Sequence, residues 1–124
     1  MKKLSFAKKK KVNKSLLKRK CDMLFSRLVR SMGFCHFEGK DKVRCTPNLQ
    51  CMHIIGRSNL RLRWDMMNCL SGCSGHHMYY THHPLEFIET IMQCWPDRYK
   101  YVVAHRNELN QETYEETLNR LKAT

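Results

Sequence analysis

The feature that most constrains the fold of this chain is its supply of metal-ligating side chains, because 124 residues contain seven cysteines and seven histidines. An odd number of cysteines disfavours a fully paired disulfide scaffold. A domain of this size buries only a modest share of its surface, so a bound metal ion would help to stabilise it. Thiolate and imidazole together are ligands that suit zinc. The sequence therefore predicts one small domain with reduced thiols and a zinc site.

Charge is the second constraint. The formal net charge is +12, and residues 1 to 20 carry ten Lys or Arg and no acid. Residues 1–12, with the run Lys8, Lys9, Lys10 and Lys11, are interpreted as a disordered basic arm that becomes ordered on a phosphate backbone; a solubilising tail is the alternative. No apolar run approaches the roughly 18 to 20 residues of a membrane span. The expected partner is a polyanion, with no membrane, and the expected location is the cytoplasm, or the host-cell cytoplasm if a phage encodes the chain.

Periodicity predicts one α+β domain over residues 13–124. An amphipathic helix with basic outer residues is expected from about Asn13 to Met32, ended by Gly33. Its apolar stripe recurs at helical spacing and is widened by Phe25 and Val29: Leu17, Cys21, Leu24, Leu28 and Met32. Residues 34–55 are predicted to form a small hairpin with His53 in its second strand, followed by an arginine-rich loop over 56–63. Further helices are expected over 84–95, from Pro96 onward, and over 110–122.

Three residues suit the chemistry of phosphodiester hydrolysis. That reaction needs a base to deprotonate water and a cation to neutralise charge on the phosphoryl oxygens. His53 fits the base because imidazole titrates near neutral pH. The amide of Asn68 could orient His53 or touch the metal, and His77 is the best single candidate for a metal ligand. Nearby in sequence, three arginines could clamp phosphate, although loop arginines are often only solvated: Arg57, Arg61 and Arg63.

Several motifs together resemble a known family. They are Leu49-Gln-Cys-Met-His-Ile-Ile55, Arg57, Arg63-Trp-Asp65, Asn68, Cys73-Ser-Gly-His-His77 and Pro84-Leu-Glu-Phe87. In this order the sequence resembles the HNH (His-Me finger) endonucleases, in particular small phage proteins related to the NinG/Rap recombination nucleases. The resemblance covers about residues 13–105. It implies a small ββα-metal domain with flanking helices and a zinc-stapled hairpin or knuckle.

The resemblance also implies roles for the three residues. His53 would be the general base, Asn68 would position it, and His77 would bind Mg²⁺ or Mn²⁺. Many family members have Asp or His directly before the base, where this chain has Met52, and a thioether is a poor ligand for a hard cation. Asp65, His82 or water would then complete the shell of the cation, and Asp65 is preferred because its ligand atom is a carboxylate oxygen.

The family's structural zinc uses two Cys-x-x-Cys knuckles, and both are altered here. Cys73 and His76 keep the spacing with an imidazole in the second position, while Cys35 is followed at that spacing by Glu38. We predict zinc ligation by Cys35, Cys73 and His76, and leave the fourth ligand open between Glu38 and Cys45. The alternative is a set of buried reduced thiols with a capping histidine. The remaining cysteines are assigned to the core: Cys21, Cys51, Cys69 and Cys94.

These features make a metal-dependent DNA endonuclease the leading hypothesis, acting on duplex or branched DNA by nicking or cutting. The alternative is a catalytically inactive, zinc-stabilised nucleic-acid-binding module, for which Met52 is the best argument. A structural or assembly protein is a third possibility. Monomer and homodimer both stay open.

Overall fold

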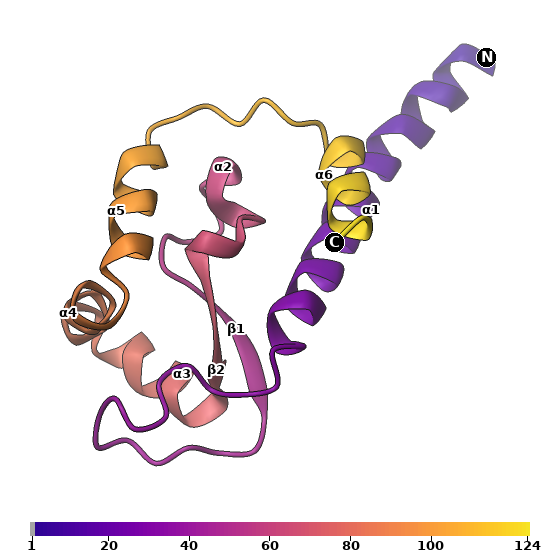
Figure 1. Cartoon of the computed structure of the whole chain (residues 1–124). Helices are drawn as coiled ribbons and strands as arrows, with labels where there is room; N and C mark the ends of the chain where they lie inside the picture. The colour runs from indigo at the N-terminus through magenta and orange to yellow at the C-terminus, as the bar shows by residue number, and fades with distance from the viewer. Residues whose placement is uncertain (1) are drawn as a thin grey trace.

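The computed structural model describes residues 2–124, and side chains from residue 14 onward. Helices dominate, and a single two-stranded sheet lies between them (Figure 1), which is an α+β arrangement as the sequence predicts. The elements follow in the order α1 (Lys2–Arg30), β1 (Leu49–His53), α2 (Leu60–Arg63), the 3-10 turn η1 (Met66–Asn68), β2 (Cys69–Cys73), α3 (Ser74–His82), α4 (Pro84–Cys94), α5 (Pro96–His105) and α6 (Tyr114–Lys122).

The sheet is formed by β1 and β2 in antiparallel register, with Leu49 opposite Cys73 and His53 opposite Cys69. The predicted hairpin within residues 34–55 is therefore wrong, and His53 ends the first strand rather than lying in a second one. Two residues disfavour a strand over residues 34–48, where none is observed. Gly39 has a positive φ, and Pro47 has no amide hydrogen to donate to a neighbouring strand. The partner of β1 is β2, and all five residues of β2 are buried.

Helix α1 covers one side of the sheet, and α6 packs alongside it (Figure 1). The predicted apolar face is confirmed, but its buried centre runs through Cys21, Phe25 and Val29, which pack against Trp64 and residues of α6. The leucines of the predicted stripe that border this line are partly buried against the same core: Leu17, Leu24 and Leu28. The helix is followed by Gly33, whose φ of 80° suits a residue without a Cβ atom. Its first residue is Lys2, whereas the sequence predicted a disordered arm over residues 1–12. Side chains of residues 1–13 lie outside the described part of the structure, so the predicted phosphate contacts of Lys8 to Lys11 stay a prediction.

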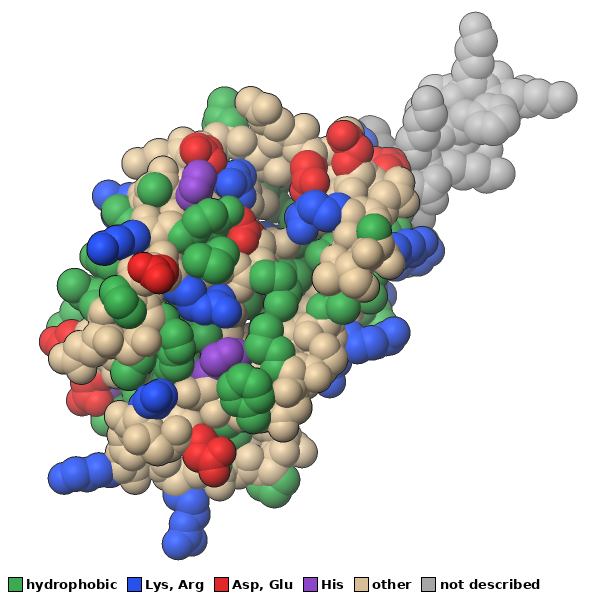
Figure 2. Space-filling view, in the orientation of Figure 1, with side chains coloured by type: hydrophobic (Ala, Val, Ile, Leu, Met, Phe, Trp, Pro, Cys, Tyr) green, Lys and Arg blue, Asp and Glu red, His purple; other side chains and the backbone are tan. Residues whose placement is uncertain are grey.

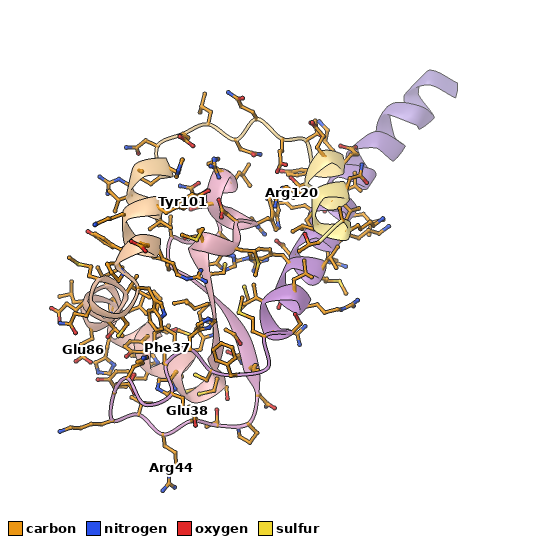
Figure 3. All side chains as sticks on the ribbon, viewed as in Figure 1. Phe37, Glu38, Arg44, Glu86, Tyr101 and Arg120 are labelled. Carbon is orange, nitrogen blue, oxygen red and sulfur yellow. The ribbon has the colours of Figure 1, made fainter. Side chains whose placement is uncertain are left out.

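A second core lies on the other face of the sheet. Its centre is Phe37, which packs with Met52 and Leu70 and points inward, whereas Arg44 projects away from the molecule (Figure 3). A Cβ atom on Gly72 would lie 2.0 Å from Sδ of Met52. The residue before His53 is thus a core residue, because strand alternation directs it away from the face that carries His53.

The segment α2–η1 links the two strands and is fastened from both sides, with Tyr101 of α5 and Arg120 of α6 reaching toward it (Figure 3). Tyr101 donates a hydrogen bond to the carboxylate of Asp65 (2.6 Å), and Arg120 donates to the carbonyl of Trp64 (3.2 Å). Arg98 adds two hydrogen bonds, one to the carbonyl of Met66 in η1 and one to the carbonyl of Cys69 at the start of β2. This bracing fixes the end of β1 relative to the start of β2.

The other predicted helices are close to their observed bounds. Proline begins both α4 and α5, as expected from the fixed φ of that residue. Helix α6 begins at Tyr114 rather than at residue 110, because Thr113 and Glu116 form a capping box at its start. Within residues 2–124, no helix combines the length and the apolar character needed to cross a membrane.

Candidate functional site

Four side chains that are distant in sequence form a compact cluster, which we call the Cys3His cluster. It consists of Cys35, Cys45, Cys73 and His76, whose ligand atoms all lie within 4.8 Å of one another. The three sulfur atoms lie 3.6, 3.6 and 3.1 Å from Nδ1 of His76. Tetrahedral zinc with ordinary bond lengths separates sulfur and nitrogen ligands by about 3.6 Å. One ring nitrogen cannot serve three thiols by hydrogen bonding, so the geometry fits a shared metal ion, and the cluster could hold zinc.

The hydrogen bonds around the cluster favour ionisation of one of its thiols, that of Cys73. Cys73 is the N-cap of α3 and accepts a hydrogen bond from the amide of His76, while the amide of Cys73 points to the sulfur of Cys35. Burial opposes ionisation of Cys73, but amide and imidazole donors from Thr46 and His76 prevail and lower its pKa to about 6. Burial and the neighbouring thiols raise the pKa of Cys45 to about 12. The Cys73 thiolate therefore favours a bound cation, whereas the thiol of Cys45 would lose its proton only when a metal ion binds.

A carboxylate orients the cluster's imidazole. Nε2 of His76 lies 2.8 Å from Asp41, which also accepts hydrogen bonds from the hydroxyl of Tyr80 (2.5 Å) and the amide of Val43 (2.9 Å). A carboxylate behind a metal-binding histidine fixes the ring and its tautomer, leaving Nδ1 for the metal. Sequence reasoning missed Asp41, because an isolated acid in a loop has no spacing pattern. Burial lowers the pKa of His76, but Cys73 and Asp41 outweigh it and the net shift is upward.

The fourth position of the cluster, left open between Glu38 and Cys45, is taken by Cys45. Glu38 is exposed on the loop and belongs to no ligand group among the described residues. The reason is the loop itself, which turns back after Gly39 and brings residue 45 to the start of α3, where the hydroxyl of Thr46 contacts Ser74 (2.7 Å).

A cleft opens between α1, β1 and the start of α3, and both His53 and His77 line it. Its volume of about 810 Å³ lies within the range of ligand-binding clefts, roughly 300–1,000 Å³. The other lining residues are Asp22, Met23, Phe25, Ser26, Arg27, Arg30, Leu49, Gln50, Cys51, Gly56 and Arg57. Lys and Arg side chains also gather along the edge formed by α1 (Figure 2). The two imidazoles therefore share one basic cavity.

The ring of His53 is held in one tautomer. Its Nε2 lies 2.9 Å from the carbonyl oxygen of Arg63, and a carbonyl can only accept, so Nε2 carries the hydrogen and Nδ1 keeps the lone pair. Burial lowers the pKa of His53, and the cations of Arg57 and Arg63 lower it further. The imidazole is consequently neutral at pH 7 and can accept a proton.

His77, on α3, is oriented in a similar way by Gln50 of β1, the strand that also carries His53. Its Nδ1 lies 2.6 Å from Oε1 of Gln50, so the amide oxygen accepts from Nδ1–H and Nε2 keeps the lone pair. Burial lowers the pKa of His77. Neutral imidazole is the form that binds metals. Among the described residues, no group of three potential metal ligands contains His77, so any hard cation there would draw its remaining ligands from water and substrate oxygens.

Asn68 is fully buried and binds backbone rather than an imidazole. Its side chain accepts a hydrogen bond from the amide of Ile55 (2.8 Å) and donates to the carbonyls of Ile55 and Leu62 (3.0 Å each). These bonds fix the chain just after His53 and the helix just before Arg63. The amide therefore positions the surroundings of His53 and does not reach the cleft.

Two further candidates lie outside the cleft. Asp65, the preferred second ligand for a catalytic cation, caps η1, pairs with Arg61 (3.0 Å) and lines a separate cavity. That assignment is corrected, since the carboxylate is committed to Arg61 and Tyr101. His82 is exposed near the end of α3 and does not line the cleft.

The three predicted phosphate-binding arginines differ in their surroundings. Arg63 and Arg57 both pair with Asp22 (2.7 Å each), and of these two Arg57 lines the cleft. Arg61 pairs with Asp65 and Glu108 away from it. Sequence reasoning missed two cleft arginines on α1, because they were read only as the basic outer face of that helix: Arg27 and Arg30.

A second sulfur-containing group adjoins the cleft. Ligand atoms of Cys51, His53 and Cys69 lie within 4.8 Å of one another, and this Cys2His cluster could also hold a metal. Cys69 is fully buried, as predicted, but Cys51 lines the cleft and is not simply a core residue. A hydrogen bond with Cys69 lowers the pKa of Cys51 against the effect of burial, and Arg57 and Arg30 lower it further.

Comparison of the chain with protein-family models, with curated proteins and with solved structures gives no match.

Proposed function

We propose that the chain is a metal-dependent DNA endonuclease that hydrolyses phosphodiester bonds, with a metal at the Cys3His cluster serving as a structural staple. The observation that carries the proposal is the pairing of His53 and His77 in one basic cleft, each with its tautomer fixed by a protein oxygen. The order of β1, β2 and α3 is the order that a ββα-metal fold requires.

The base in this proposal is Nδ1 of His53. Nε2–H donates its hydrogen bond to the Arg63 carbonyl, so Nδ1 is the ring nitrogen with a free lone pair and the one that can accept a proton from water. A lowered pKa keeps that nitrogen unprotonated at neutral pH. The Asn68 side chain acts through the backbone by holding the segment that follows His53.

Substrate binding would rest on the arginines of the cleft. Arg27 and Arg30 lie on α1 and form no ion pair within the described part of the chain, so they are available to phosphate. Asp22, the single acid of the cleft, is already neutralised by Arg57 and Arg63. DNA binding of this kind weakens steeply as salt rises.

His77 would contribute Nε2 to a divalent cation such as Mg²⁺ or Mn²⁺, which would neutralise charge on the scissile phosphate. One imidazole without a carboxylate is a weak site for a hard cation. Cleavage should therefore require added divalent ion and stop when a chelator removes it, while zinc at the Cys3His cluster survives dialysis.

The test is cleavage of supercoiled plasmid and of a branched DNA with added Mg²⁺ or Mn²⁺. His53→Ala should lower the rate by about 10²–10⁴-fold, the usual contribution of a general base. His82→Ala is the matched control, because it removes an exposed imidazole that does not line the cleft, and it should keep wild-type activity. Cleavage that survives His53→Ala would overturn the role of His53 as base.

A second candidate function is a zinc-stabilised nucleic-acid-binding module without catalysis. The observation that favours it is the burial of Met52, which leaves no metal ligand directly before His53. Salt-sensitive binding of the same DNA by a folded, zinc-loaded protein that does not cleave with either cation would support this function over the endonuclease.

A further inference from the structure

The Cys2His cluster is formed by cross-strand neighbours on one face of the sheet. In the register of the two strands, His53 lies opposite Cys69 and Cys51 lies opposite Ser71. Alternation along each strand puts all four residues on the same face, so the three potential ligands converge through the backbone geometry alone. Their ligand atoms lie within 4.8 Å of one another, close enough for one ion to contact all three after small side-chain movements.

We propose that Cys51, Cys69 and His53 form a second binding site for a soft or borderline divalent ion such as Zn²⁺, open to the cleft and separate from the Cys3His cluster. Two thiolates and one imidazole are a recurrent ligand set for zinc when a fourth position stays open to water. Cys51 lines the cleft and gives the ion a route of entry, while Cys69 closes the site from the core side.

The hydroxyl of Ser71, on the same face of the sheet, independently points to a further group at this site, because it has no hydrogen-bond partner in the part of the molecule that the structure describes. Its Oγ is buried, and among the described residues it is the one buried side-chain oxygen or nitrogen atom that has no hydrogen-bond partner. Buried polar groups of this kind usually have an acceptor or an ordered water. A metal-bound thiolate on Cys51, directly across the strand pair, or a water on the ion would accept from it.

The site overlaps the nitrogen that the proposed function uses. Because Nε2 of His53 donates to the Arg63 carbonyl, a metal ion at the cluster would bind through Nδ1. The same lone pair cannot accept a proton from water while it binds a metal. Zinc at this site would thus inhibit cleavage, a consequence that rests on the proposed function, whereas the binding itself does not.

The binding test counts zinc by competition with a chromophoric chelator under reducing conditions. Wild-type protein should bind two equivalents per chain, one at each cluster. Cys51→Ala should bind one and keep a wild-type far-UV spectrum. Cys94→Ala is the matched control, since it removes another half-buried free thiol that belongs to neither cluster, and it should bind two. One equivalent in wild type, or an unchanged count in Cys51→Ala, would overturn the proposal.

The cleavage assay then tests the consequence. Zinc added at one equivalent beyond the tightly held ion should lower wild-type Mg²⁺-dependent cleavage by about 100-fold, the order of a general base's contribution. The rate of Cys51→Ala, relative to its own rate without added zinc, should be insensitive to that equivalent. If the protein binds two equivalents of zinc but has no nuclease activity, the proposed function is wrong and the second zinc site still stands. If the protein is active but binds one equivalent, the second site is wrong and the proposed function still stands. Loss of two titratable thiols with one bound zinc would mean a Cys51–Cys69 disulfide and would also overturn the proposal.

Discussion

The side-chain amide of Asn68 allows a sharp prediction, because Asn68→Asp keeps the shape of the side chain but replaces the NH2 donor by an oxygen that can carry negative charge. The amide donates to the carbonyls of Ile55 and Leu62 and accepts from the amide of Ile55, with no exposure to solvent. A carboxylate would keep the accepted bond, lose both donated bonds and direct negative charge at two carbonyl oxygens. The variant can relieve that repulsion only by taking up a proton.

The magnitude follows from that proton. Holding a carboxyl protonated at pH 7.5, about 3.6 units above its ordinary pKa of about 3.9, costs about 5 kcal/mol at 1.36 kcal/mol per unit. Because the protonated group restores one donor, a single lost hydrogen bond adds about 1 kcal/mol. The folded-state pKa is raised, so the loss of stability is largest above it and shrinks as the pH falls toward the unfolded pKa. At pH 5.5 the proton costs about 2 kcal/mol, so about 3 kcal/mol should be recovered.

Thermal unfolding followed by circular dichroism at pH 7.5 and 5.5 measures both values. For a chain of this size, about 4 °C per kcal/mol predicts a midpoint roughly 20 °C below wild type at pH 7.5 and a gap roughly 10 °C smaller at pH 5.5. Asn119→Asp is the matched control, because Asn119 is exposed on α6, and it should stay within about 0.5 kcal/mol of wild type. A midpoint for Asn68→Asp that equals wild type, or a deficit that does not change with pH, would refute the reasoning.

Three further predictions follow from the site. Cys45→Ser should lose zinc on dialysis and lower the unfolding midpoint, whereas Glu38→Gln should change neither, as measured by elemental analysis and calorimetry. Because burial lowers the pKa of His53, the cleavage rate should be level above about pH 6.5 and fall only below it, the unperturbed value; a rising limb centred well above that value contradicts the assignment. Arg27→Gln should reduce the slope of log affinity against log salt by about one, and Arg61→Gln, which loses the pairing with Asp65 instead, should leave the slope unchanged.

The sequence predicted α4, α5, α6 and the packed part of α1 because their signals are local, whereas residues 56–63 were expected to form a loop and contain the short helix α2. The stripe on α1 and the prolines that begin α4 and α5 act within a few residues and need no knowledge of the rest of the chain. The strand pairing is different, since β1 could pair with any β-prone segment. Its true partner, β2, is specified by packing between α1 and the Phe37 core, which no local pattern records.

The candidate site divides in the same way. Cys73 and His76 could be predicted because one helical turn joins them, and the structure keeps them 3.1 Å apart. Cys45 and Asp41 come from an irregular loop, whose path depends on turns that spacing does not encode. Asp65 shows the opposite case. Its pairing with Arg61 at the i,i+4 position is a local signal that argues against a free metal ligand, and carboxylate chemistry alone gave the wrong preference.

One strand connects the two halves of the site. Cys73 ends β2, caps α3 and contributes a thiol to the Cys3His cluster, while His76 and His77 follow within the first turn of α3. A metal held by Cys73 and His76 therefore fixes the start of α3 and, with it, the direction of the His77 ring toward Gln50 and the cleft. At the other end of the same strand, Cys69 lies opposite His53. The distance between the two imidazoles thus depends on the β1–β2 register and on the metal cluster together, so loosening the cluster should displace His77 while the α1–α6 core is still folded.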